Sequence, residues 1–104
     1  MAGVNTKGEI LAHYPDGEDW IVAEADGIGG ANLLVVGENY PFDYLVHHSY
    51  HFETEEEAST AAEWLDWKTR VGDSDPATFF SELEAGKKPW IDEPYDEELD
   101  PDAQ

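Results

Sequence analysis

The sequence predicts an α+β domain: a four-stranded antiparallel sheet, two helices packed on one of its faces, and an acidic C-terminal tail. Three observations predict this fold class. The hydrophobic period changes from two residues to about 3.6 residues at residue 54. Two β-prone runs flank an Asp-Gly pair at residues 16 and 17, which is a hairpin signal. A short apolar run at 32–36 is typical of a central strand buried on both faces.

Four strands are expected in the first half of the chain. The first two lie at 9–14 and 20–25, on either side of the Asp-Gly turn, and a glycine-rich connection at 26–30 leads to the third at 32–36. After a turn at 37–43, apolar side chains alternate from residue 44 to residue 52, as they do in a strand with two different faces. Strands that follow one another in this way favour an antiparallel meander.

Two helices are expected after the sheet. Thr54 is placed to cap the first helix, Glu57 completes a capping box, and Gly72 ends the helix. Asp75 and Pro76 are typical of the cap and first position of a second helix that runs to residue 85. The inward faces consist of small and apolar residues, namely Ala58, Ala61, Ala62, Leu65 and Thr69 on the first helix and Phe79, Phe80 and Leu83 on the second. The residues expected to be largely buried in the core are Ile21, Leu34, Val46, Phe52, Trp64 and Leu65.

The chain divides into a flexible lead-in at 1–7, a single domain at 8–88 and an acidic tail at 89–104. The tail holds seven acidic residues, three prolines and no basic residue, a composition typical of a solvated tail. Trp90, Ile91 and Tyr95 favour packing of its first part on the domain as far as about residue 95.

Charge limits the possible functions of the protein. Twenty-five acidic residues against five basic ones give a net charge of −20 at pH 7, which opposes binding to nucleic acid or to an anionic membrane. Residues 53–104 carry seventeen of the acids and four of the bases, and therefore −13 of the −20. Because 40% of the residues are hydrophobic and 12% are aromatic, the chain is expected to fold despite this charge. The lack of cysteine, of a signal peptide and of an apolar run of about 20 residues predicts a cytoplasmic protein.

No motif predicts catalysis, a metal or another cofactor. His47 and His51 share one face of their strand but lie about 13 Å apart along it, and His48 points to the other face. The glycines at 27, 29 and 30 precede a strand, so no helix N-terminus is available to hold a phosphate. Nothing marks out a carboxylate with a shifted pKa among so many. A protein that is not an enzyme is therefore expected.

The acidic surface is the remaining signal, and it predicts a basic protein partner. Carboxylates fixed along helices can imitate the phosphates of a duplex, which fall about one per 1.7 Å of its axis. In size and charge the chain resembles the acidic inhibitors, DNA mimics among them, that mobile elements use against restriction or CRISPR nucleases. Two alternatives are generic acidity from adaptation to high salt, and an immunity protein or antitoxin for a basic toxin nuclease. The predicted partner-binding residues are Glu55, Glu56, Glu63, Asp66, Trp67, Glu82, Glu84, Asp92 and Glu93.

Overall fold

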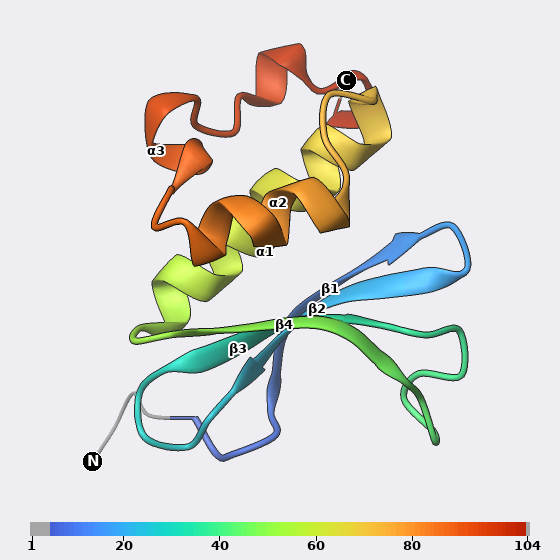
Figure 1. Cartoon of the computed structure of the whole chain (residues 1–104), viewed down its shortest axis with the longest axis vertical. Coiled ribbons are helices and arrows are strands. Elements are labelled where there is room, and N and C mark those ends of the chain that lie inside the picture. The colour runs from blue at the N-terminus through green and yellow to red at the C-terminus, as the bar shows by residue number, and fades with distance from the viewer. Residues whose placement is uncertain (1–4, 104) are drawn as a thin grey trace.

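The computed structural model describes residues 5–103 and confirms the predicted fold class. The strands β1 (Ile10–Asp16), β2 (Asp19–Ala25), β3 (Ala31–Val36) and β4 (Val46–Phe52) form one antiparallel sheet in the order β1-β2-β3-β4. The main helices α1 (Glu55–Val71) and α2 (Pro76–Glu84) lie on one face of this sheet, as Figure 1 shows. Three short helical turns follow, α3 (Pro89–Asp92), η1 (Glu97–Leu99) and η2 (Pro101–Ala103).

The first hairpin and the N-terminal segment follow local signals. Asp16 pairs with Asp19, so the turn has two residues, and its first residue is Gly17 at a φ of 63°. Of the predicted flexible lead-in at 1–7, residues 1–4 lie outside the described residues. In its described part, the Asn5 side chain donates a hydrogen bond of 2.7 Å to Glu55 at the start of α1.

The ends of α1 form where the sequence places them. The Thr54 hydroxyl accepts a hydrogen bond from the backbone N–H of Glu57 at 3.1 Å, and Gly72 ends the helix in the left-handed conformation with φ 81°. This confirms one half of the predicted capping box. The Glu57 carboxylate instead binds the ammonium group of Lys88, at 2.8 Å.

The core lies between the sheet and the helices, and most of the predicted core is confirmed. Close contact is possible because the inward side of α1 is lined by alanines, so that the helix sits directly over β1, β2 and β3. The side chains of α2 that were expected to face inward are buried. So are four of the six residues predicted for the core, Ile21, Phe52, Trp64 and Leu65.

Two core predictions are wrong. Val46 is 51% exposed because the register shift between Val35 and Val36 pairs it with Val36, on the same face of the sheet as Leu34. Beyond the shift, His48 faces the helices and stacks on Phe80. Leu34 is only half-buried because it lies on the face of the sheet that the helices leave uncovered. The strand also begins at residue 46 rather than at 44.

Candidate acidic interface

Residues 89–103 form a continuous segment that we call the C-terminal strap. The strap leaves α2 and runs along the side of the helices that faces away from the sheet (Figure 1). Its first part is anchored by Trp90, which is buried against Phe52 and Phe79 at ring-centroid distances of 5.7 and 5.9 Å. The aromatic residues of the tail therefore mark packing, and this packing continues well beyond residue 95.

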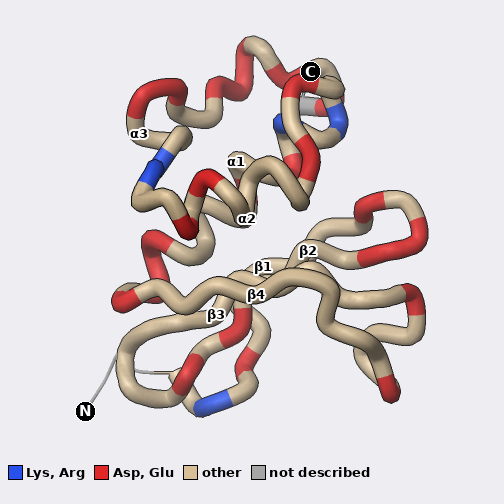
Figure 2. Tube along the Cα trace, viewed as in Figure 1, with Lys and Arg blue, Asp and Glu red and all other residues tan. Residues whose placement is uncertain are grey.

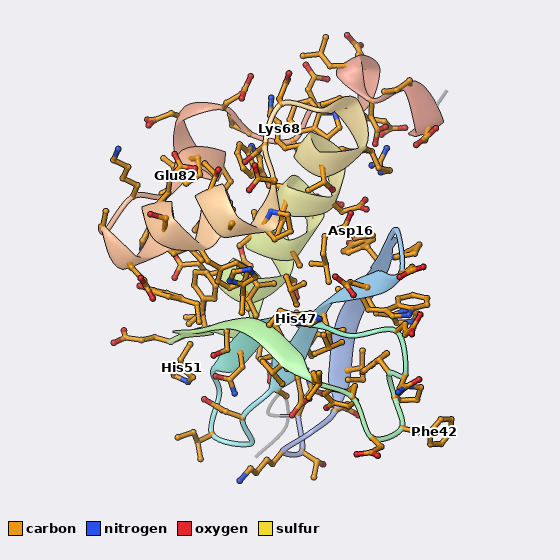
Figure 3. All side chains as sticks on the ribbon, turned by 45° about the vertical axis from the view of Figure 1, so that its right-hand side comes forward. Asp16, Phe42, His47, His51, Lys68 and Glu82 are labelled. Carbon is orange, nitrogen blue, oxygen red and sulfur yellow. The ribbon has the colours of Figure 1, made fainter. Side chains whose placement is uncertain are left out.

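Lys68 on α1 holds the first half of the strap. Its side chain is buried and lies 4.3 Å from the centre of the Trp67 ring, in cation–π geometry. The Lys68 ammonium contacts the Glu93 carboxylate at 2.7 Å and the Asp73 carboxylate at 3.4 Å. Beside it, the Trp64 indole N–H donates to the backbone carbonyl of Glu93 at 2.6 Å. Figure 3 labels Lys68 in the helical layer, on the side away from the sheet.

Arg70, one half-turn further along α1, holds the second half of the strap. Its guanidinium donates to both carboxylate oxygens of Asp100, at 2.6 and 2.9 Å, and to Asp102 at 2.8 Å. Its Nε donates to Asp66 on the same helix at 3.0 Å. The Tyr95 hydroxyl also donates to Asp100, at 2.6 Å. Asp100 is therefore buried with a bidentate cationic partner and a phenol donor.

These contacts shift the protonation equilibria of the strap. The hydrogen bonds from Arg70, and then from Tyr95, hold the pKa of Asp100 well below its usual range. The same Asp100 bond, together with desolvation, raises the pKa of Tyr95 to about 12. Burial raises the pKa of Asp66, and the bond from Arg70 offsets this only in part. The Arg70 pKa is raised, chiefly by its hydrogen bond to Asp100, so the guanidinium carries its positive charge at neutral pH.

The strap corrects the predicted surface of α1. Trp67, one of the predicted partner-binding residues, is only 2% exposed, because the strap crosses the outward side of α1 and Tyr95 packs edge-on against it at 5.4 Å. Asp66 was expected to face the partner and is 7% exposed in its ion pair with Arg70. Glu55 is half-buried and bonded to Asn5.

The other predicted site residues remain accessible. Glu56, Glu63, Glu84, Asp92 and Glu93 are exposed, and Glu82 is half-buried. Glu82, Asp92 and Glu93 line one hollow between α2 and the strap, and Glu56 shares another hollow with Trp90. The structure thus brings most of the predicted acids to the outer side of the helical layer.

Sequence reasoning missed the acids in the second half of the strap. Asp96, Glu97, Glu98 and Asp102 are exposed on a segment held in place by Lys68 and Arg70, and Figure 2 shows acidic positions along the whole strap. The signal that could have found them is the pair of bases in an otherwise acidic helix, followed by aromatic residues in an otherwise polar tail.

The histidines and the glycine-rich turn form local contacts. His51 lies 2.7 Å from Asp26, and the nearest carboxylate oxygen to His47, that of Asp19, is 3.7 Å away. The Asp26 carboxylate also accepts from the backbone N–H groups of Ile28 and Gly30, which closes the turn at 26–30. Within residues 5–103 there is no cluster of three or more side chains placed to hold a metal ion.

The chain matches no protein-family model, no curated protein and no solved structure. None of the helices described for residues 5–103 is long and apolar enough to cross a membrane.

Proposed function

We propose that this protein is a non-enzymatic acidic binding protein that occupies the nucleic-acid-binding surface of a basic partner, as a mimic of duplex charge. The observation that carries the proposal is the clamped strap. A tail with seven acids would ordinarily be mobile, but here Lys68 and Arg70 fix it against α1. The backbone that carries the exposed carboxylates of the strap is therefore held against α1, which spaces these charges along a fixed path as the phosphates of a duplex are spaced.

Electrostatics supports the same proposal. Three of the five basic side chains, those of Lys68, Arg70 and Lys88, are paired with carboxylates of the protein itself. The remaining field is strongly negative, so it accelerates encounter with a basic surface and opposes encounter with nucleic acid. Glu56 and Glu63 are seven residues apart on one helix, so they present charges about 10 Å apart beside the strap.

The direct test is capture followed by competition with DNA. The immobilised full chain is incubated with host lysate at about 150 mM salt, where surface charges still act over about 8 Å. We expect the captured proteins to be nucleic-acid-binding proteins, and duplex DNA to release them. A gel shift with the same duplex should show no binding by the protein itself. Direct DNA binding, or capture that duplex DNA does not reverse, would contradict the proposal.

Charge reversal locates the binding surface. In the double variant Glu56→Lys with Glu63→Lys, we expect binding of the captured partner to be lost and the thermal midpoint to stay unchanged or rise, because net repulsion falls. The matched control is Glu38→Lys with Asp43→Lys, which makes the same change of charge at exposed positions of the β3–β4 loop. If affinity for the partner stays within about threefold in the helix variant, this surface is not the interface.

Unfolding as a function of salt separates this proposal from adaptation to high salt. A salt-adapted domain unfolds when salt is lowered below about molar concentration, because its acidic surface is then unscreened. For a mimic that works at physiological salt, we expect the folded state at about 150 mM salt, measured by circular dichroism.

A further inference from the structure

The outer side of β4 is an unpaired strand edge. In the order β1-β2-β3-β4, the strand β4 bonds to β3 on one side only, and no strand among residues 5–103 pairs with its other side. Such an edge presents a row of free N–H and C=O groups to which another extended chain can bond.

The two edges of the sheet differ in how well they resist such pairing. At the other edge, β1 contains Pro15, which has no N–H, and its pairing with β2 is irregular between Ile10 and Ala12. The irregularity at β4 is confined to its start, where the register shifts between Val46 and His48. Although 29% of the chain is charged, residues 44–52 include no Asp, Glu, Lys or Arg. Proline, charge and bulges commonly protect a sheet edge from pairing with another strand. Of the two edges of this sheet, β4 is therefore the less protected.

A cavity adjoins the second half of β4. Its volume is about 390 Å³, within the range of about 300–1,000 Å³ that is usual for ligand pockets. It opens between the end of β4, the start of α1 and the connection from α2 to α3. Its apolar walls are Tyr50, Phe52, Leu83 and Trp90, so it suits an apolar side chain. Its polar lining holds both signs of charge and consists of His51, Glu53, Glu57, Lys87 and Lys88.

We propose that an extended, basic segment of the protein partner adds to the sheet as a fifth strand along β4 and places one apolar side chain in this cavity. The sign of the partner's charge rests on the proposed function. The rest follows from the open edge and the cavity beside it. A second copy of the chain is a poorer occupant, because it would bring one net charge of −20 against another.

The geometry of a strand sets the pattern of the added segment. Successive side chains of a strand point to opposite faces, so every second residue of the segment lies on the helical side, beside Tyr50 and Phe52. The alternate residues lie on the other face, beside Ser49 and His51, and Figure 3 shows His51 on the side of the sheet away from the helices. We therefore expect apolar residues at alternate positions and basic residues between them.

Synthetic peptides test this arrangement. The first is a blocked peptide of about seven residues that alternates lysine with valine and leucine, matching the length of β4. The second has the same charge, but its central apolar residue is proline. We add a saturating amount of the first peptide to the full ¹⁵N-labelled chain. We then expect the hydrogen-exchange rates of alternate amides in β4 to fall by a factor of about ten or more. The first peptide should also shift the NMR signals of Tyr50 and Leu83. The proline peptide should neither slow the exchange of the β4 amides nor shift these signals.

Two results would overturn the inference. If both peptides change the same signals, or change only those of α1 and the strap, the peptides bind through charge alone. If the β4 amides are protected without peptide and this protection rises with protein concentration, the occupant is a second copy.

Proline variants test the edge itself. Neighbouring amides of a strand point to opposite sides, so one of His48→Pro and Ser49→Pro removes an outward amide and the other removes a bond to β3. The thermal midpoint identifies the outward variant, which keeps the fold. That variant should lose about tenfold in affinity for the alternating peptide, as expected for one backbone bond and the strain beside it. Unchanged affinity would refute strand addition.

The two proposals fail in separable ways. Neither position of the variant Glu56→Lys with Glu63→Lys lines the cavity beside β4. Because the two peptides carry the same charge, this variant should leave the ratio of their affinities unchanged. If captured proteins are released by DNA but the two peptides bind alike, the charge mimic stands and the strand addition falls. If the peptides differ but DNA releases nothing, the strand addition stands and the mimic falls.

Discussion

Replacement of Leu65 by alanine tests whether α1 lies on the sheet as described. Leu65 is fully buried, and the substitution removes three carbon groups, worth about 2.5 kcal/mol in transfer free energy. A cavity of about 80 Å³ would add about 2 kcal/mol if nothing relaxed around it. The nearest neighbours on the same stripe, Ala61 and Ala62, have no rotatable side chains with which to fill the space. We therefore expect a loss of about 3–4.5 kcal/mol in the free energy of unfolding.

Urea unfolding followed by circular dichroism measures this loss, with the slope of the transition checked for constancy between variants. The matched control is Leu99→Ala in the strap, which makes the same chemical change at a side chain that is 63% exposed. Its effect should stay within about 0.5 kcal/mol. A loss below about 1 kcal/mol for Leu65→Ala would show that another face of α1 meets the sheet.

Two further predictions concern the protonation of the strap. Because the folded pKa of Asp100 is depressed, its contribution to stability is present above its unfolded pKa of about 3.9 and is lost as pH falls below it. Thermal midpoints between about pH 6 and pH 2.5 should therefore fall more steeply for the native chain than for Asp100→Asn, whereas Asp92→Asn should follow the native chain. Because the pKa of Tyr95 is raised to about 12, its contribution is present below the unfolded value near 10 and is lost as pH rises towards 12. Ultraviolet titration at about pH 11 should show one phenolate fewer in the native chain than in Asp100→Asn, and equal counts would refute the Tyr95–Asp100 bond.

Local chemistry explains why much of the fold could be predicted from the sequence. The change of hydrophobic period, the Thr54 cap and the Gly72 stop depend on residues within a few positions of one another, and each is confirmed. The stripe of alanines on α1 predicts close contact with the sheet for the same reason. Such signals fix the class and the order of elements, because each residue's neighbours in sequence are also its neighbours in space.

The errors share a different cause, which is contact between distant parts of the chain. Trp67 and Asp66 lie on the outward side of α1, and their burial depends on a segment about thirty positions later, as the Arg70–Asp100 bond shows. Composition alone favours a solvated tail at 89–104. The buried ammonium of Lys68, the partly exposed guanidinium of Arg70 and the ring of Tyr95 override that preference. At Val46 the error comes from the register shift between Val35 and Val36, which puts Val46 on the uncovered face although the sequence alternates regularly there.

The clamps of the strap are better understood as fixing geometry than as adding stability. Burying Lys68 and Asp100 costs solvation free energy that their partners largely return, so a buried ion pair is weak evidence of net stabilisation. The Arg70–Asp100 pair nevertheless fixes the position of the strap on α1, because a bidentate guanidinium–carboxylate bond tolerates little displacement. In a chain with a net charge of −20, an unclamped acidic tail would be repelled from the rest of the protein. Lys68 and Arg70 oppose that repulsion at two points and leave the intervening carboxylates exposed. A protein that imitates the charge of a duplex needs this combination of strong repulsion overall and fixed local placement.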